Sequence, residues 1–192
     1  FGNGLVRIVA TDAHKMYFSK KIECSFAATK QFVITGDFNK LKKANEILIL
    51  TDDRLMIDGL IFDCFTDGNY PNYNAVIPQY ETFISCDKKE LSKAVKQAAL
   101  TANKTTHKVN MYMNGSISIS GEDVDFDNEG AVNLMYKMKT FEDCTIGFNA
   151  KLLLDCLSVV ESNEITMQTN GKPSKAVLIT DTNATMLLMP ME

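Results

Sequence analysis

The sequence predicts an α+β fold built from copies of one unit, which is a helix followed by three antiparallel strands. Three segments have helical periodicity, strand-like sequence follows each of them, and turns rich in Asn, Asp and Gly separate the strands within each set. A single unit would leave one sheet face and one helix stripe uncovered. We therefore expect the units to pair or stack.

The first two helical segments have recognisable N-caps and apolar stripes. In GDFNKLKKANE, residues 36–46, Asp37 is the expected N-cap, and one side carries Phe38, Leu41 and Ala44. In SCDKKELSKAVKQAALTANK, residues 85–104, Asp87 and Glu90 form a capping box. The predicted buried stripe of this second helix consists of Leu91, Ala94, Val95 and Ala98. The expected strands lie at 46–53, 54–59 and 60–68 after the first helix and at 109–115, 116–121 and 131–139 after the second.

The third helical segment, FNAKLLLDCLSVV at 148–160, has Asn149 as its expected N-cap. Its predicted inward-facing residues are Leu152, Leu153, Cys156, Leu157 and Val160. Three more strands are expected at 164–171, 176–181 and 184–191. The three N-caps are 50 and 62 residues apart, which favours a repeated supersecondary unit over a regular solenoid.

One predicted strand, IVATDAHKMYF at 8–18, carries an unusual number of polar residues. Ile8, Ala10, Met16 and Phe18 alternate along it, but its middle contains Thr11, Asp12, His14 and Lys15. A hydrolase would use such a cluster as an acid, a base and an electrostatic stabiliser, and a binding protein would use it as the polar rim of a pocket. The stretch alone favours a third interpretation, a strand that passes from core to solvent around Asp12.

No catalytic or metal-binding motif is found. The sequence lacks GxSxG, HExxH and P-loop patterns. The acidic segment GEDVDFDNEG matches a calcium loop at Asp123, Asp125 and Asp127, but it has Asn128 where glycine is needed and Leu134 where the bidentate Glu is needed. Five scattered cysteines without a CxxC pair, together with two histidines, indicate reduced thiols in the cytosol and no zinc site. We therefore expect no metal and no cofactor.

The chain shows no targeting or membrane segment. Its longest apolar runs are far shorter than the roughly 20 residues that a spanning helix needs. No secretory signal is visible, and the first residues, FGNG, lack an initiator Met, so we expect a processed or partial product.

Charge patterning points to a local basic face on an acidic protein. The net charge of −4 argues against a surface coated with basic residues for nucleic acid. Lysines nevertheless gather on two helical segments, at Lys40, Lys42 and Lys43 and at Lys88, Lys89, Lys93 and Lys96. Lysine is also the ordinary solvent-facing helix residue. If both helices lay on one surface, that surface would contact phosphates without reading bases.

Four blocks of sequence resemble the bacterial DNA polymerase III beta subunit family, the sliding clamps. VATDAHKM at 9–16 is similar to the family segment VATDGHRL, and GNYPNYNAVIP at 68–78 to GxFPDYxxVIP. IGFNAKLLLDCL at 146–157 is similar to IGFNxxYLLDxL, and LLMPM at 187–191 to a C-terminal VMPM. The blocks occur in the family's order and at comparable spacing over essentially the whole chain.

The resemblance implies a DNA-clamp fold, with sheets outside and helices facing a DNA lumen, and a domain organisation. Residues 1–80 would be the latter part of the clamp middle domain and 81–192 the complete C-terminal domain. The first domain and the opening helix of the second would be absent. We expect a fragment rather than a naturally short relative, because position 1 is not Met.

The resemblance also implies a pocket into which the polymerase and other clamp-binding proteins insert a short peptide. The residues that would line it are Thr11, His14, Lys15, Met16, Pro71, Val76, Asn149, Leu152, Ser174, Ala176, Leu187, Leu188, Met189, Pro190 and Met191. We expect Asp12 to bind nearby backbone amides and not to act as an acid. Ala13 replaces a family glycine, Lys15 an arginine and Leu152 a tyrosine, and these departures predict a more apolar, less selective pocket.

The function that the resemblance implies is that of a processivity factor, a non-catalytic subunit of a DNA polymerase holoenzyme in the bacterial cytoplasm. Its partners would be double-stranded DNA, bound without sequence preference, the replicative polymerase, the clamp loader and other clamp-binding proteins, and a second subunit in a homodimeric ring. The residues expected to face DNA are Lys40, Lys43, Lys88, Lys89, Lys93 and Lys96. Two alternatives stay open: a clamp-like peptide-binding adaptor that does not encircle DNA, and a small hydrolase that uses Asp12 and His14.

Overall fold

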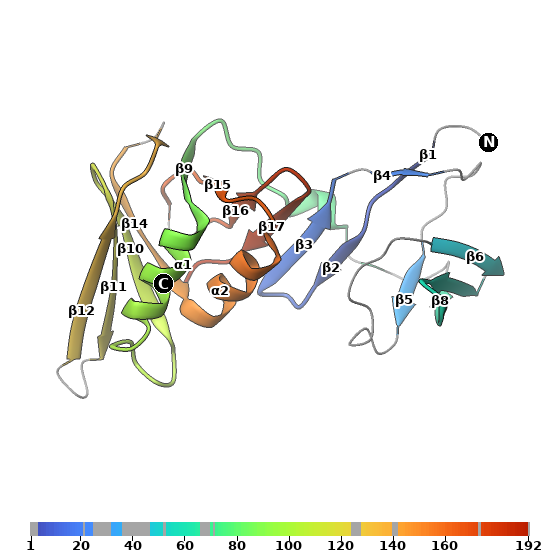
Figure 1. The fold of residues 1–192 in the computed structure, drawn as a ribbon, viewed down its shortest axis with the longest axis horizontal. Helices are drawn as coiled ribbons and strands as arrows, with labels where there is room; N and C mark the ends of the chain where they lie inside the picture. Colours follow the sequence, from blue (N-terminus) through green and yellow to red (C-terminus); the bar gives the residue numbers. More distant parts are fainter. Residues whose placement is uncertain are drawn as a thin grey trace. The chain divides into compact units, whose positions relative to one another are not determined.

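The chain forms two compact units, which we call unit 1 and unit 2. The computed structural model describes residues 4–20, 22–24, 32–35, 47–51, 53–65, 70, 72–123, 128–139, 142–172 and 174–191. Unit 1 comprises Phe1–Leu5 and Glu23–Val76, and unit 2 comprises Val6–Ile22 and Ile77–Glu192. The chain passes between the units in β1 (Gly4–Val6) and β4 (Ile22–Cys24), which pair with each other (Figure 1).

Unit 1 contains a four-stranded antiparallel sheet in the order β5-β8-β7-β6. Its strands are β5 (Val33–Thr35), β6 (Ile47–Thr51), β7 (Arg54–Ile57) and β8 (Leu60–Phe65), and a 3-10 turn, η2 (Tyr73–Ala75), follows. The predicted three strands from β6 to β8 are confirmed. Asp58 and Gly59 turn the chain from β7 to β8 with positive φ angles of 46° and 81°, the conformation that an Asp-Gly hairpin turn requires. The predicted helix at 36–46, with Lys40, Lys42 and Lys43, lies outside the described residues.

Unit 2 contains two repeats with the same order of elements. The first repeat consists of β9 (Phe83–Asp87), α1 (Lys88–Ala98), β10 (Lys108–Met113), β11 (Ile117–Asp123) and β12 (Asn128–Leu134). The second consists of β14 (Cys144–Asn149), α2 (Ala150–Val159), β15 (Glu164–Gln168), β16 (Val177–Thr180) and β17 (Ala184–Leu188). The α+β class and the three antiparallel strands after each helix are confirmed. The strand before each helix was not predicted.

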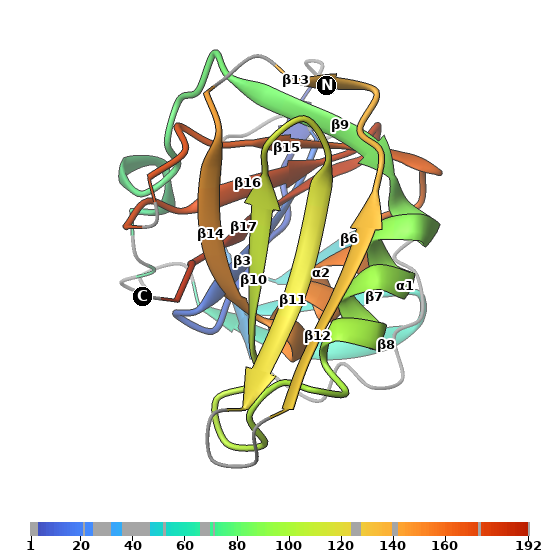
Figure 2. The ribbon, with the colours of Figure 1, turned by 90° about the vertical axis from the view of Figure 1, so that its left-hand side faces the viewer.

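The two repeats exchange their first strands. One sheet has the order β12-β11-β10-β14, so the first strand of the second repeat pairs with β10 of the first repeat (Figure 2). The other sheet has the order β13-β9-β15-β16-β17-β3-β2, in which β9 of the first repeat pairs with β15 of the second. The remaining strands of this sheet are β13 (Met138–Lys139), β2 (Val9–Thr11) and β3 (Lys15–Ser19). Neither repeat can complete its sheet without the other.

Both helices begin where the sequence predicts. The Asp87 carboxylate accepts a hydrogen bond from Glu90 N at 2.9 Å, and Asn149 Oδ1 accepts from Lys151 N and Leu152 N at 3.0 and 3.2 Å. The predicted stripe of α1 is buried, and so are the inward-facing residues of α2 except Leu152, which is half-buried. α1 contacts β9, β11 and β12, α2 contacts β14 and β17, and the helices contact each other. One hydrophobic core therefore joins both repeats.

Two strand predictions are wrong. IVATDAHKMYF is not one strand but a hairpin, in which β2 and β3 pair with Thr11 opposite Met16 and Val9 opposite Phe18. The polar residues in its middle form the turn, where they bind backbone groups that a continuous strand would place in a ladder. The segment 131–139 is also not one strand, because β12 ends at Leu134 and β13 joins the other sheet beside β9.

Neither helix described in the structure has the length and apolar composition needed to cross a bilayer.

Close packing of α1 on β11 depends on a glycine. Gly121 lies on the buried face of β11, and a Cβ atom there would be 2.0 Å from Ala98 O and 2.9 Å from Ala102 N. These atoms belong to the backbone of the last residue of α1 and of the turn that follows it, so neither can move aside without displacing the end of the helix.

We therefore expect Gly121→Ala to lower the free energy of unfolding by about 3 kcal/mol, because the methyl group overpacks this contact. The measurement is urea denaturation followed by circular dichroism. Ser118→Ala, a change on the opposite face of β11, serves as the control and should cost less than about 1 kcal/mol. Equal midpoints for Gly121→Ala and wild type would show that α1 does not pack on β11 in this way.

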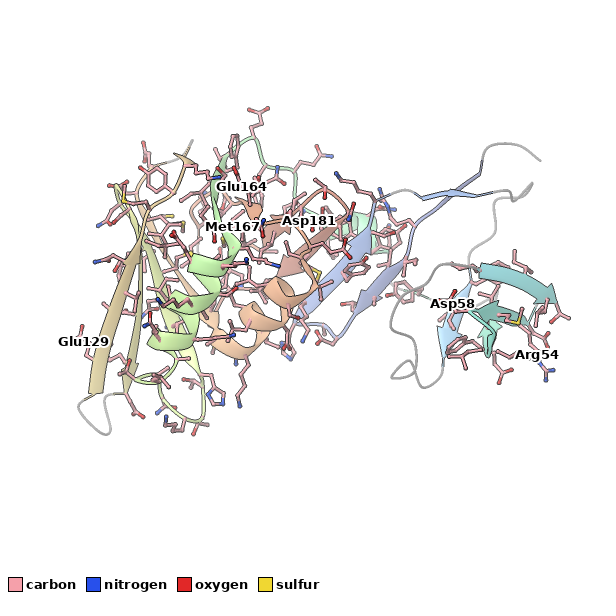
Figure 3. All side chains as sticks on the ribbon, in the orientation of Figure 1. Arg54, Asp58, Glu129, Glu164, Met167 and Asp181 are labelled. Carbon is pink, nitrogen blue, oxygen red and sulfur yellow. The ribbon has the colours of Figure 1, made fainter. Side chains whose placement is uncertain are left out.

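A buried carboxylate fixes the end of α2 to the β16–β17 turn. Asp181, labelled in Figure 3, accepts hydrogen bonds from Glu161 N, Asn183 N and Ala184 N at 2.7–2.8 Å. Burial raises the pKa of this carboxyl, but the backbone N–H groups lower it more, so the pKa lies below its ordinary value of 3.8. The ionised form is thus favoured in the folded state.

Because the folded-state pKa is depressed, the stability that Asp181 contributes should be present above about pH 4 and lost as the pH falls through the folded-state pKa. We expect Asp181→Asn to lower the free energy of unfolding by about 2 kcal/mol at pH 7. Thermal melts of wild type and variant between pH 2 and 7 should show this difference shrinking in acid. A difference that is constant across the pH range would contradict the assignment.

Candidate functional site

The turn of the β2–β3 hairpin is held by its own polar side chains. Thr11 Oγ1 donates a hydrogen bond to Lys15 O at 3.0 Å, and Asp12 Oδ1 accepts from His14 N at 3.1 Å and Lys15 N at 2.9 Å. Partial burial raises the pKa of the Asp12 carboxyl, but these N–H groups and the Lys15 ammonium bring it below 3.8. The expectation that Asp12 binds backbone amides is confirmed.

Lys15 links this hairpin to α2 through an ion pair. Its Nζ lies 3.2 Å from Asp12 Oδ2 and 3.1 Å from Asp155 Oδ2 on α2. Partial burial lowers the pKa of Lys15, but the two carboxylates raise it above its ordinary value of 10.5. Asp155 was not predicted, since an acidic residue on the exposed side of a helix gives no sign of a partner 140 residues away.

The chain after β17 forms a C-terminal tail, Met189–Met191, that runs between the hairpin and β14. Within the sheet, Met16 is opposite Leu187 and Lys15 is opposite Leu188. Met189 N then donates to His14 O at 3.0 Å, and Met191 N donates to Gly147 O of β14 at 2.8 Å.

The surface and the underlying layer of this site differ in residue type. Met16, Ala176, Leu187 and Leu188 are buried, so they support the site from below. The accessible residues are Thr11, His14, Met189 and Ser174, with Lys15, Asn149, Leu152, Pro190 and Met191 half-buried. The structure therefore brings together, in unit 2, the predicted residues of the hairpin, the start of α2 and the tail.

Four of the predicted pocket residues need a separate account, two inside the site and two outside it. Ala176 directly precedes β16, whose Val177 is opposite Leu188, so Ala176 lies next to the start of the tail, and its carbonyl accepts a hydrogen bond from Tyr80 Oη at 2.7 Å. Asn149 uses its carbonyl to cap α2, and its amide donates to Thr106 O at 3.1 Å. Val76 is exposed and belongs to unit 1, and Pro71 lies outside the described residues.

Three of the four predicted DNA-facing lysines of α1 are exposed. These exposed residues are Lys89, Lys93 and Lys96. They line a shallow, open hollow on the surface of α1 together with Lys88, Ser92, Gln97 and Leu100. Lys88 is half-buried, and its Nζ donates to Val160 O at 2.7 Å. Lys40 and Lys43 lie outside the described residues.

Within the described part of the chain, no three His, Cys, Asp or Glu side chains gather closely enough to hold a metal ion. Cys64, Cys86, Cys144 and Cys156 are reduced thiols. Burial raises the pKa of Cys86 to about 12 and that of Cys156 to about 11. Thiols with such pKa values are poor nucleophiles at neutral pH.

The fold of paired repeats is shared with solved structures of sliding clamps. The structure matches that of the DNA polymerase III subunit beta from Borrelia burgdorferi with a TM-score of 0.84 at 22% identity, covering 100% of this chain and 53% of that one. It matches the sliding clamp of Pseudomonas aeruginosa bound to griselimycin with a TM-score of 0.83 at 19% identity, covering 100% and 56%. At these identities the likeness shows the fold alone.

Sequence comparison gives the family. Residues 74–192 match the model of the DNA polymerase III beta subunit, C-terminal domain. The beta sliding clamp of Bacillus subtilis is 26% identical over 95% of this chain and 52% of its own length, and that of Synechococcus elongatus is 21% identical over 97% and 55%. The chain belongs to the DNA polymerase III beta subunit family, and it spans about half the length of these relatives.

The departure from the family pattern at position 13 has a structural cost. Ala13 lies in the hairpin turn with a φ of 72°, in the left-handed region that favours glycine.

We expect Ala13→Gly to raise the free energy of unfolding by about 0.5–1 kcal/mol, because relief of the left-handed conformation outweighs the added freedom of the unfolded chain. Thermal and urea denaturation measure this change. Ala10→Gly, in the neighbouring strand β2, is the matched control and should instead destabilise by about 0.5–1 kcal/mol. A destabilising Ala13→Gly would contradict the turn geometry.

Proposed function

We propose that this chain is part of a sliding clamp, a non-catalytic subunit that encircles duplex DNA and tethers the replicative polymerase in the bacterial cytoplasm. The family assignment supports this proposal, and so do the named relatives, which do not favour an adaptor that never encircles DNA. We propose the division at residues 80 and 81 between a middle and a C-terminal domain as the corresponding organisation. In the whole protein, two subunits would close the ring.

The observation that carries the peptide-binding proposal is the placement of the tail. Met189 and Met191 are hydrogen-bonded through their backbones to His14 and Gly147, so their side chains are presented from a fixed backbone between the hairpin and β14. Flexible thioethers above a buried aliphatic layer suit the capture of apolar peptide side chains. Clamp-binding segments of the polymerase, the clamp loader and other partners would bind at this site.

The lysine face of α1 would contact DNA. Ammonium groups on flexible stems neutralise phosphates without reading base edges, which permits movement along the duplex and makes binding sensitive to salt. Lys89, Lys93 and Lys96 would contribute most, because Lys88 already donates its ammonium to Val160 O. Lys40 and Lys43 are predicted to contact DNA in the same way.

The hydrolase alternative has no support in the geometry of the hairpin. The Asp12 carboxylate already accepts two backbone hydrogen bonds and lies beside the Lys15 ammonium, which lowers its basicity. We therefore propose no catalytic role for Asp12 or His14, no metal and no cofactor.

The test is fluorescence anisotropy with a labelled peptide that ends in a Leu-Phe pair. We expect a dissociation constant in the micromolar range for a cleft that buries two or three side chains of the peptide. This corresponds to a binding free energy of about −8 kcal/mol. Met191→Glu should abolish binding, because the peptide would bury an unpaired carboxylate. His14→Ala should weaken the binding free energy of the peptide by only about 1 kcal/mol, because one polar contact is lost.

Met135→Glu provides a matched control, since Met135 is an exposed methionine directly after β12 in the other repeat. It should bind the peptide like wild type. Wild-type affinity in Met191→Glu, with an unchanged melting temperature, would show that the peptide does not bind at the tail.

A further inference from the structure

Two described loops of unit 2 contain an Asn-Gly pair, and the structure distinguishes between them. Asn114-Gly115 joins β10 to β11 (Figure 2), and Asn170-Gly171 follows β15. In such a pair the backbone nitrogen of the glycine can attack the side-chain amide of the asparagine, because glycine has no Cβ atom to hinder the approach. Asparagine is for this reason a thermolabile residue in proteins. The contacts of each pair decide whether the attack can occur in the folded chain.

The Asn114-Gly115 pair is open to this reaction. Both residues are exposed, and a Cβ atom placed on Gly115 would meet nothing within 4 Å. Gly115 N donates no hydrogen bond to any described residue, and the carboxamide of Asn114 has no described partner either. The loop is closed instead by the backbone of Asn114, whose N–H donates to Ser116 O at 3.1 Å. The attacking nitrogen and the amide carbon are therefore neighbours that no other described residue engages.

The Asn170-Gly171 pair has the same two residues in a different environment. Gly171 N donates to Thr169 Oγ1 at 3.1 Å, so the attacking nitrogen is occupied. Asn170 Oδ1 accepts a hydrogen bond from Lys172 N at 3.1 Å, which holds the carboxamide toward Lys172. Gly171 also packs against Cys144, since a Cβ atom on it would lie 3.3 Å from Cys144 Cβ. Reaction at this pair requires both hydrogen bonds to break.

We propose that Asn114 is a site of spontaneous deamidation, whereas Asn170 is protected by its hydrogen bonds. Gly115 N forms a bond to Asn114 Cγ, the bond between Cγ and Nδ2 breaks, and the amide nitrogen leaves as ammonia with the proton of the Gly115 N–H. Water then opens the five-membered imide at either carbonyl and gives aspartate or isoaspartate, each with one added negative charge. No reactant other than water is consumed. The inference goes beyond the proposed function and does not depend on it.

The isoaspartate product disturbs the loop more than the aspartate product does. Its chain runs through Cβ and Cγ, so one extra backbone atom enters a loop whose two ends are fixed. The residues at these ends, Met113 and Ile117, are 1% and 0% exposed and pair with each other. The loop therefore cannot lengthen without displacing a buried side chain or breaking the hydrogen bond between Asn114 N and Ser116 O.

The test is incubation of the folded chain in mildly alkaline buffer, followed by mass spectrometry of tryptic peptides. Peptides 109–137 and 152–175 contain one Asn-Gly pair each. The first should gain the mass of one deamidation about tenfold faster than the second, because reaction at Asn170 first requires the loss of hydrogen bonds. In concentrated urea, where neither environment exists, the two pairs should react at nearly the same rate.

Thr169→Val provides a matched variant for the protected pair. It removes the acceptor for Gly171 N while the side chain keeps its shape. Circular dichroism checks that the variant is folded. Deamidation of Asn170 should become faster in this variant, and that of Asn114 should keep its wild-type rate.

Isoaspartate is detected by an isoaspartate-specific methyltransferase, which transfers a labelled methyl group to it from S-adenosylmethionine. Fully aged wild type should take up the label in peptide 109–137. Its melting temperature should be about 2–4 °C lower than that of fresh protein, since one hydrogen bond of the loop is lost. Freshly prepared Asn114→Asp, which has the added charge without the longer backbone, should take up no label and melt like fresh wild type.

Equal rates at the two pairs in the folded chain would overturn the inference. A rate difference that persists in urea would overturn it as well, because the difference would then come from the neighbouring sequence and not from the fold. Aged protein that contains aspartate alone, without the methyl label, would exclude the imide. Label in peptide 109–137 with an unchanged melting temperature would contradict the effect on the loop.

Discussion

The exchange of β9 and β14 between the two repeats is the constraint on which the rest of unit 2 depends. Each exchanged strand ends at the N-cap of its own helix, Asp87 or Asn149, so each helix starts from a strand in the other repeat's sheet. Separating the repeats would break two ladders and open the shared core at once. A helix followed by three strands, which could not bury its surfaces alone, thus becomes half of a single folded body.

The same exchange builds the proposed peptide site. The tail after β17 reaches β14 at Gly147, where a Cβ atom would lie 2.6 Å from Met191 O, so this position admits only glycine without moving the tail. The hairpin extends the sheet beside β17, and the Lys15–Asp155 pair ties it to α2. Segments from the beginning, middle and end of the chain are therefore joined by a few directional contacts around a small apolar surface.

Local signals predicted much of this fold, and non-local pairing accounts for what they missed. Caps and periodicity located both described helices, because these signals lie within a few residues of each other. Local patterns do not predict β9 and β14, because the partners of these strands belong to another repeat. The pattern of residues 8–18 predicts one strand and not a hairpin, because the turn lacks glycine. The site residues came from resemblance to a family, and Asp155 had no local signal.

Hydrogen exchange of backbone amides tests most directly whether strand exchange makes the two repeats one cooperative body. Under conditions in which exchange reports opening equilibria, amides of β9, β10, β14 and β15 should exchange with one common free energy, equal to that of global unfolding. If the amides of β10 and β11 exchanged through a smaller opening while those of β15 and β16 stayed protected, the repeats would unfold independently, and the account would be contradicted.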